Sequence, residues 1–458
     1  MFKKLSFLRP ILAILIIFIP LYPKFPLASV TGTYVAIRLD DIVVALSILV
    51  WIIYQLKSKF PIFKEPVTFL VSAYFLAITI SLLNAILIYQ TDPSNILILN
   101  FLRRFEYISL FFITTSTLSS VKNYRPYYIF LSLTTIGVLI YGYGQKYLQF
   151  PIVSTMNSEF SKGQLLQMDN WSRISSTFAG HYDLAAFLSI VLVIIGGVII
   201  VQKNIYLKLT NIIIWLFCFH LLTLTASRVS IFAFYGGMIL ATVLLKKYWW
   251  IIPVTFFFAL SIFNSKDLNQ RLLATIPALK KQLFPTAIPT KVPVVVLPTS
   301  SPVVIAKTTP IVIRVTPIPT VIRHGPIDEY IPIDADVGVA RSGEIRFNAE
   351  WPRAITAFRK NILFGTGLGS ITLATDNDYL RSLGETGAIG FISFMAIFIY
   401  FAYMTYQKQS ATNLVFLASM VTFLINATLI DVFEASKTAY LFWIMMGFYY
   451  HSLKNSKL

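Results

Sequence analysis

Arginine and histidine side chains lie at the edges of apolar runs in two segments of this chain. Residues 171–188, WSRISSTFAGHYDLAAFL, place Arg173 and His181 just before an apolar run. Residues 222–234, LTLTASRVSIFAF, place Arg228 in a very short connection between two such runs. Two arginines facing the same side could clamp a diphosphate through bidentate, charge-assisted hydrogen bonds, and a nearby histidine could take a proton from a hydroxyl.

A third segment, residues 365–391, supplies carboxylates before another apolar run. Its sequence is GTGLGSITLATDNDYLRSLGETGAIGF, and its polar side chains include Asp376, Asn377, Asp378, Arg381 and Glu385. A carboxylate here could accept the proton of an acceptor hydroxyl. The three segments together suggest transfer of a group from a diphosphate to a hydroxyl.

A fourth charged set lies inside a predicted helix rather than at its end. Arg103, Arg104 and Glu106 lie close together in that run. Ionisable groups at membrane depth are energetically costly and usually face a cavity or a partner. We therefore expect Arg103 and Arg104 to support a site.

Each of these residues also has a plainer explanation. Arg173 and Arg228 could anchor helix ends at lipid headgroups. His181 fits helix packing better than a ligand role, and Asp376 and Asp378 could cap a helix or only be solvated in a loop.

The residues do not indicate a resident metal or nucleotide. The single cysteine, Cys218, lies in an apolar run, so an internal disulfide and a cysteine metal cluster are excluded. The DADVG stretch at 334–338 lacks the later ligands of a calcium loop. The glycines of 365–369 do not have the strand-then-helix context of a nucleotide-binding turn. We predict no metal and no cofactor.

Long apolar runs must position these polar segments. Hydrophobic residues make up 56% of the 458 residues and charged residues only 13%, which is too few for a soluble protein of this length. Each run is long enough to cross about 30 Å of hydrocarbon. We predict an all-α polytopic membrane protein with about twelve transmembrane helices, at 8–23, 39–56, 67–88, 96–118, 127–148, 182–201, 209–226, 229–245, 248–264, 388–406, 411–430 and 436–452.

The placement of lysine and arginine predicts the orientation. Alternate short connections are basic, and positive charge near membrane helices marks the cytoplasmic side. We therefore predict a multi-pass plasma-membrane protein with both termini in the cytoplasm and the polar segments outside. This placement explains much of the net charge of +18 without a nucleic-acid partner. The basic residues are Lys3, Lys4, Arg9, Lys57, Lys59, Lys64, Lys122, Arg125, Lys203, Lys208, Lys246, Lys247, Lys408, Lys454 and Lys457.

Two outer connections are long, about 149–181 and about 265–387. The second divides the chain into a membrane domain of helices 1–9 (1–264), a large extracytoplasmic loop between helices 9 and 10 (265–387) and helices 10–12 (388–458). Residues 284–332 form a Pro/Thr-rich insert that we interpret as an extended spacer or an edge-like strand excursion, because proline interrupts helices and sheets. A tolerated insertion without chemistry is the other explanation.

The end of this loop has the spacing of an amphipathic helix over residues 344–360. Apolar residues fall on one face and basic residues lie elsewhere. We expect this helix on the outer membrane surface or over a cavity, where the loop could limit access of water. The predicted apolar face consists of Ile345, Ala349, Pro352, Ile355 and Phe358.

At these motifs the sequence resembles the O-antigen ligase and polymerase family. The resemblance covers most of the chain and rests on the order and spacing of short motifs. These are YVAIRLDDIVVAL (34–46), FLRRFEYISLFF (101–112), RISSTFAGHYDLAAFL (173–188), LTASRVSIFAF (224–234), and IRFNAEWPRAITAFRKNILFGTGLGS followed by NDYLRSLGETGAIGF.

The resemblance implies a glycosyltransferase-C type fold and a metal-independent enzyme. Such an enzyme moves glycan from a polyprenyl-diphosphate carrier to an acceptor hydroxyl on the outer face. Arg173 and Arg228 match the arginines that hold the lipid diphosphate, and Arg346 of the IRFNAEWPR stretch joins them as a diphosphate-binding residue. Membrane lipids are the surrounding partner.

The predicted catalytic residues follow from the same resemblance. Asp376-Asn377 stands where the family often has His-Asn, so Asp376 is expected to replace the histidine as base. His181 and Glu385 are the other candidates, and an inactive protein is the remaining alternative. Arg103, Arg104 and His181 are expected to support the site.

The sequence leaves the acceptor and one other function class open. The acceptor could be a lipid-anchored core, a second lipid-linked glycan or a protein hydroxyl, which correspond to a ligase, a polymerase and a protein glycosyltransferase. A transporter or flippase of polysaccharide intermediates would also suit twelve spans, although no internal repeat of two related halves is visible. A non-catalytic surface anchor would leave the arginines unexplained.

Overall fold

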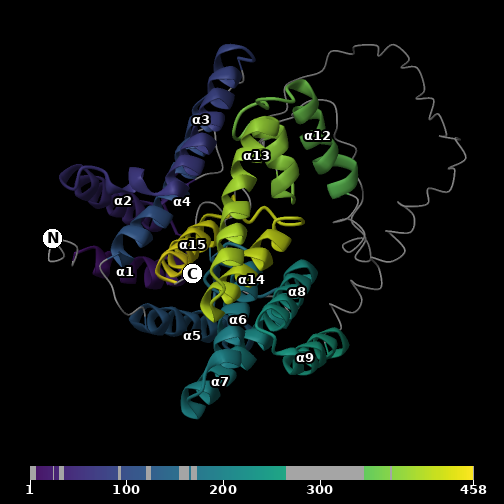
Figure 1. Cartoon of the computed structure of the whole chain (residues 1–458). Coiled ribbons are helices and arrows are strands. Elements are labelled where there is room, and N and C mark those ends of the chain that lie inside the picture. Colours follow the sequence, from purple (N-terminus) through teal and green to yellow (C-terminus); the bar gives the residue numbers. More distant parts are fainter. Residues whose placement is uncertain are drawn as a thin grey trace, which may run out of the picture. The chain divides into compact units, whose positions relative to one another are not determined.

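The computed structural model describes residues 7–23, 25–29, 36–90, 94–119, 125–153, 165–166, 173–264, 345–371 and 374–456. These residues are predominantly helical (Figure 1). Six helices are long and apolar enough to cross a membrane, as in a polytopic membrane protein. They are α2 (Leu39–Lys57), α3 (Pro66–Leu87), α5 (Arg125–Leu148), α6 (His181–Val201), α7 (Ile205–Leu224) and α13 (Asp378–Gln407).

Each of the twelve predicted apolar runs coincides with a helix. The number of helices that cross a membrane stays a prediction, because several of these helices are short or carry polar residues. The other six are α1 (Leu8–Leu21), α4 (Ser94–Leu118), α8 (Arg228–Leu244), α9 (Ile251–Asn264), α14 (Ala411–Asn426) and α15 (Ser436–Asn455).

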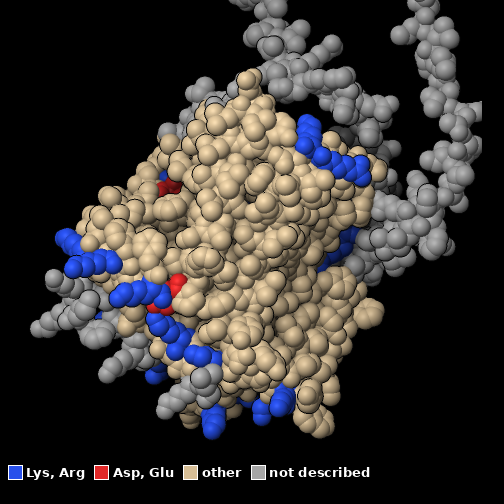
Figure 2. Space-filling model, turned by 45° about the horizontal axis from the view of Figure 1, so that its top comes forward, with Lys and Arg blue, Asp and Glu red and all other residues tan. Residues whose placement is uncertain are grey.

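The surface has the character expected of membrane-embedded helices. Figure 2 shows a broad face without charged side chains, and lysine and arginine gather at its margins. Large apolar side chains are exposed along the long helices, for example Phe69 (77%) on α3 and Ile140 (62%) on α5. In a membrane such side chains contact lipid, so their exposure removes no stability.

Helix α6 is the most enclosed of the long helices. It is apolar on all sides, and most of its residues are buried. It packs against α7, α8 and α14. A Cβ on Gly197 would lie 2.4 Å from the side chain of Val415, so glycine is needed where α14 crosses α6.

Helices from the two ends of the chain pack together. α15 packs against α4, α13 against α3, and α14 against α8 as well as α6 (Figure 1). Residues before 272 and after 344 form one compact unit. Polar segments far apart in sequence can therefore meet within it.

Short elements complete the described chain. Strands β1 (Pro26–Ser29) and β2 (Ala36–Arg38) pair antiparallel, as do β3 (Ile152–Val153) and β4 (Leu165–Leu166). Single helical turns lie at η2 (Pro61–Lys64) and η4 (Tyr248–Trp250).

Two differences from the predicted elements concern the region before the last spans. α13 begins at Asp378, ten residues before the expected start at 388, because Asn377 caps it and its polar first turns are buried by neighbouring segments. The predicted helix 344–360 is a π-helical turn, η5 (Arg346–Glu350), followed by α12 (Trp351–Lys360). The Pro/Thr-rich insert 284–332 lies outside the described residues.

Helix α12 has the expected amphipathic character and packs against α13. Ala354 is fully buried, and its carbonyl would lie 2.8 Å from a Cβ on Gly384, so the two helices touch through their backbones. Ile345 and Ile355 of the predicted apolar face are exposed, as suits a helix at a lipid surface.

Candidate functional site

The candidate site begins where α6 begins. His181 is the first residue of α6, and the guanidinium Nη1 of Arg173 donates to its Nε2 over 2.6 Å. A ring nitrogen that accepts belongs to the neutral imidazole. The two residues that the sequence analysis placed just before this apolar run are therefore in direct contact.

The segment between Arg173 and His181 is fixed to α5 and α1. The amide of Ser176 donates to Gln145 Oε1 over 2.7 Å, and its hydroxyl donates to the Val138 carbonyl over 2.7 Å. The hydroxyl of Thr177 donates to the Pro20 carbonyl over 2.6 Å. The segment has no regular secondary structure, and these hydrogen bonds hold it in place.

A buried lysine ties the same segment to the C-terminal helix. Lys437 of α15 is fully buried, and its ammonium donates to the carbonyls of Pro20 (3.2 Å), Tyr22 (2.5 Å) and Thr177 (2.7 Å). It also lies 5.1 Å from the centre of the Phe178 ring, within the range of a cation–π contact.

Arg228 is held at the first residue of α8. The preceding turn has Ala226 in the left-handed region, at φ 52°. The hydroxyl of Ser230, which itself accepts from Ser227 over 3.1 Å, donates to Asn426 Oδ1 of α14 over 2.7 Å. The beginning of α8 is thus anchored to α14.

Arg346, the third predicted diphosphate-binding arginine, lies near Arg228. Its Nε and Nη2 lie 2.9 and 2.7 Å from Asp376 Oδ2, and it also interacts electrostatically with Tyr182, the residue after His181. The positive charges of Arg346 and Arg173 both act on Arg228. Three arginines from segments far apart in sequence therefore converge.

Convergence of like charges has an electrostatic consequence. Guanidinium groups remain charged in proteins, so neighbouring arginines repel one another unless anions lie among them. A diphosphate would remove this repulsion and would accept several charge-assisted hydrogen bonds. We call Arg173, Arg228, Arg346 and Asp376 the arginine cluster.

Two carboxyl groups of this region have shifted proton affinities. Burial raises the pKa of Asp376, although the charge of Arg346 opposes the rise. Burial, and then the negative charge of Asp376, raises the pKa of Glu350 to about 7. Asp376 also has φ 49°, a left-handed conformation that aspartate tolerates better than most residues.

The side chain of Asn377 has a structural role. Its oxygen accepts from the Leu380 amide over 2.9 Å and caps α13, and its own amide donates to Asp431 Oδ1 over 3.1 Å. Helix capping accounts for the side-chain oxygen of this residue, which the sequence placed among the catalytic groups.

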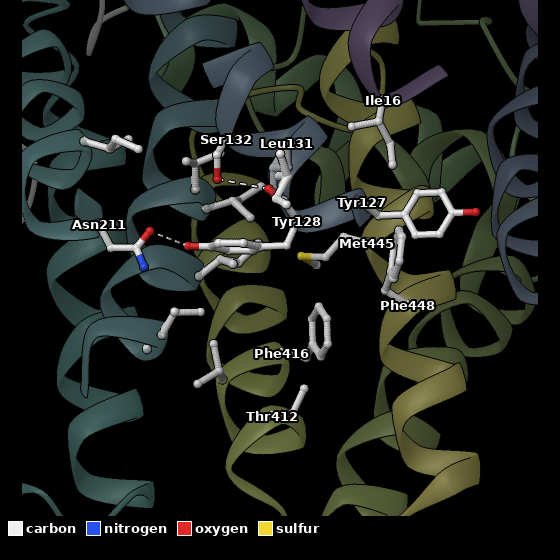
Figure 3. Close-up of a pocket in the computed structure, with 18 of the residues that line it drawn as sticks. Ile16, Tyr127, Tyr128, Leu131, Ser132, Asn211, Thr412, Phe416, Met445 and Phe448 are labelled. Atoms are coloured by element: carbon white, nitrogen blue, oxygen red, sulfur yellow. Dashed lines mark hydrogen bonds between the residues drawn. The ribbon is translucent and has the colours of Figure 1, made fainter. Parts of the chain in front are cut away.

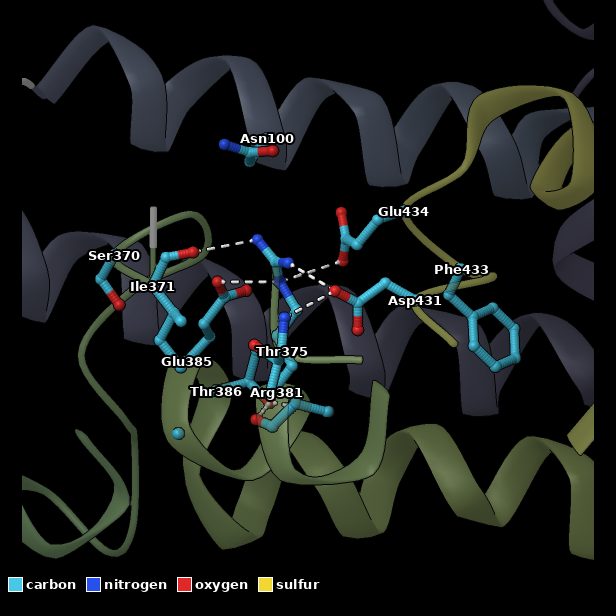
Figure 4. A network of polar contacts seen from close by, with 12 residues as sticks. Asn100, Ser370, Ile371, Thr375, Arg381, Glu385, Thr386, Asp431, Phe433 and Glu434 are labelled. Atoms are coloured by element: carbon cyan, nitrogen blue, oxygen red, sulfur yellow. Dashed lines mark hydrogen bonds and ion pairs between the residues drawn. The ribbon is translucent and has the colours of Figure 1, made fainter. Parts of the chain in front are cut away.

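Glu385 belongs to a second polar network, shown in Figure 4. Arg381 lies at the centre, with ion pairs of 3.2 Å to Glu385, 3.3 Å to Asp431 and 3.7 Å to Glu434. Asp431 Oδ2 also accepts from the Thr375 amide over 2.8 Å. We call this the Arg381 network.

Arg104 joins the Arg381 network, whereas Arg103 points elsewhere. Arg104 pairs with Glu434 and donates to the Phe433 carbonyl over 3.0 Å. Burial would raise the pKa of Glu434, but the charges of Arg104 and Arg381 outweigh it and lower that pKa. Arg103 interacts mainly with Asp41, Glu106 and two tyrosines, and its charge acts on Glu434 less than the charges of Arg104 and Arg381 do. Adjacent residues of a helix point about 100° apart, so the two arginines serve different surroundings.

Two glycine-containing segments, residues 362–367 and 384–388, pair with each other through backbone hydrogen bonds. The amides of Thr366 and Gly367 donate to the carbonyls of Gly384 (3.1 Å) and Glu385 (2.8 Å), and the Ala388 amide donates to the Ile362 carbonyl over 2.8 Å. These bonds satisfy backbone groups where α13 is interrupted, which a membrane interior requires.

Close approach explains the glycines at this pairing. Gly387 has φ 68°, and a Cβ there would lie 2.4 Å from the Leu363 carbonyl group. A Cβ on Gly365 would lie 2.4 Å from the Glu385 carbonyl group. Each glycine makes room for the other strand of the pairing, and together they fix the segment that carries Asp376.

Sequence reasoning missed several residues of these sites. Tyr182 and Glu350 border the arginine cluster, and Asp431, Glu434 and Lys437 hold the neighbouring segments. The signal for the last three was present, because DVFEASK (431–437) is a polar stretch between two apolar runs.

No protein-family model and no curated protein matches this chain. Among the described residues, no group of three or more His, Cys, Asp or Glu is arranged to hold a metal ion.

Proposed function

We propose that the chain is a glycosyltransferase that moves glycan from a polyprenyl-diphosphate carrier to an acceptor hydroxyl. The observation that supports this is the arginine cluster, in which the charges of Arg173 and Arg346 act on Arg228 and Arg346 forms an ion pair with the Asp376 carboxylate. Such a set suits an anion with several oxygens and a proton transfer next to it.

In the proposed reaction, Arg173, Arg228 and Arg346 bind the diphosphate of the donor. The acceptor oxygen attacks the anomeric carbon from the opposite side, and its proton passes to Asp376. The bond from that carbon to the diphosphate breaks, and the electron pair leaves with the diphosphate. The arginines stabilise the added negative charge in a setting with little water.

The ion pair between Arg346 and Asp376 couples binding to base strength. The charge of Arg346 now opposes the rise in the pKa of Asp376. A diphosphate at Arg346 would offset that charge, so the pKa would rise further. Binding of the donor would thus make Asp376 a stronger base.

The proposed site lies on the outer face, with both termini in the cytoplasm. The support is the alternation of basic connections along the sequence. The proposed partners are the lipid-linked donor and a glycan, lipid or protein acceptor.

The direct test uses purified protein in vesicles with a polyprenyl-diphosphate glycan and an acceptor glycan. Arg346→Ala should slow transfer by about 10²–10³-fold, the range for loss of one group that stabilises developing charge. Arg359→Ala, at an exposed position of α12, is the matched control and should keep the rate. Wild-type rates in both Arg346→Ala and Arg173→Ala would contradict the proposal.

A deletion strain would identify the acceptor class. Short surface chains would indicate a polymerase, and full-length chains stranded on the lipid carrier would indicate a ligase. An unchanged glycan profile would count against both.

One observation favours the alternative of a transporter of lipid-linked intermediates. α13 is interrupted at Gly387, and discontinuous helices are common at transporter substrate sites. For a transporter, the deletion strain would accumulate the lipid-linked glycan on the cytoplasmic face. For the proposed transferase, the glycan would accumulate on the outer face.

A further inference from the structure

A large apolar cavity lies apart from both polar clusters. It measures about 790 Å³ and lies among α5, α6, α7, α14 and α15 (Figure 3). Packed interiors rarely hold voids larger than a water molecule. A cavity of this size falls within the range of small-molecule sites and has room for a ligand.

The cavity extends toward the end of α6 that is remote from the arginine cluster. Its lining along α6 runs from Phe187 to Gln202, about 22 Å at the rise of an α-helix. His181, at the arginine cluster, is at the other end of this helix. One leaflet of hydrocarbon is about 15 Å deep, so the cavity can take a chain of that length.

The cavity is open on the side of α5 and α7. Ile129 and Leu133 of α5 and Leu207 of α7 line it and are exposed. The Tyr128 hydroxyl donates to Asn211 Oδ1 over 2.8 Å and joins the two helices beside the opening (Figure 3). A hydrocarbon chain of a membrane lipid could enter the cavity between these apolar side chains without crossing water.

The remote end of the cavity is basic. Arg125, the first residue of α5, belongs to the lining, and Lys203 follows Gln202 at the end of α6. Among the described lining residues none is acidic. An anionic group at this end would meet favourable charge, at the side that basic connections mark as cytoplasmic.

We propose that this cavity binds an acyl chain of an anionic phospholipid from the cytoplasmic leaflet, with the phosphate at Arg125. The apolar lining suits the acyl chain, and the basic end suits the phosphate. The lateral opening gives the chain a path from the membrane. The proposal is independent of the proposed transferase activity, because the cavity shares no residue with the arginine cluster.

Native mass spectrometry of the purified full chain would test the proposal, with phosphatidylglycerol and phosphatidylcholine as probes. Wild-type protein should retain phosphatidylglycerol about fivefold better, the preference expected from one basic residue near an anionic headgroup. Arg125→Gln should lose this preference. Lys146→Gln, an exposed lysine at the other end of α5, should keep it.

A second pair of variants tests the apolar part. Ile194→Trp and Val198→Trp fill the cavity and should each lower retention of both lipids at least fivefold. Ile213→Trp, at an exposed position of α7 outside the cavity lining, should not. Unchanged retention in the filling variants, or unchanged preference in Arg125→Gln, would overturn the proposal.

The donor's own polyprenyl chain is the competing occupant. If it fills the cavity, polyprenyl diphosphate would be retained in place of phospholipid, and Arg228→Ala would release it. That result would also overturn the proposal.

Discussion

The arginine cluster and the Arg381 network differ in how their charges are balanced. In the first, Arg346 pairs with Asp376, and the charges of Arg346 and Arg173 act on Arg228. In the second, Arg381 and Arg104 are surrounded by carboxylates and backbone carbonyls that hold them in place. The first set brings three cationic groups near one another, which suits a ligand anion with several oxygens, whereas the second joins α13, α4 and the connection after α14 into one body.

Removal of Arg381 should have the largest effect, because it removes the central cation of the network that stabilises the fold. Arg381→Met leaves Glu385, Asp431 and Glu434 without their shared cation, and removal of one partner from a buried pair typically costs about 3–5 kcal/mol. Thermal unfolding of the detergent-solubilised protein would measure the loss. An unfolding temperature equal to that of the wild type would show that the network is not structural.

Removal of the carboxylate from the arginine cluster should affect rate instead of folding. Asp376→Asn should lower transfer about a hundredfold or more, since a general base contributes about 10²–10⁴-fold. In the wild type, activity should fall as the pH drops through the raised pKa of Asp376. A pH–rate profile should lose this acidic limb in the variant, and persistence of the limb would assign the base to another group.

A conservative change sharpens the role of Arg228. Arg228→Lys keeps the charge but removes bidentate geometry, so we expect about a tenfold rise in KM for the donor, the effect of losing one charged hydrogen bond. Kinetics with varied donor concentration would measure it. If the lysine variant has the wild-type KM for the donor, Arg228 acts only as a point charge.

The smallest effect is expected at Glu350. Its pKa is raised to about 7, so the folded state holds more protons than the unfolded state between pH about 4.5 and 7. Stability should therefore fall as the pH rises through this window, and Glu350→Gln should remove that dependence. The change should stay below about 1 kcal/mol, because the side chain is partly exposed and screened. Unfolding temperatures at pH 5 and pH 8 would test it.

The helices were predictable because long apolar runs have few alternatives in a membrane. The early start of α13 was not, because residues 378–385 are polar. They become helical through the Asn377 cap and through burial against residues 361–371, which are contacts between separate segments.

The arginine cluster could be foreseen in part. Arg173 and Arg228 stood out because a charge beside an apolar run is unusual. The pairing of Arg346 with Asp376 joins residues 30 positions apart and has no local signature. Arg103 and Arg104 were grouped because they are adjacent, although helix geometry directs them to different neighbours.

The contacts of the connection after α14 bear on the order in which the protein is made. Asp431 accepts hydrogen bonds from the amides of Thr375 and Asn377, and Lys437 donates to the carbonyls of Pro20, Tyr22 and Thr177. The ribosome delivers Asp431 and Lys437 after every segment that they contact. The segments that carry Arg173 and Asp376 therefore gain these contacts only after α14 and the connection that follows it have been made.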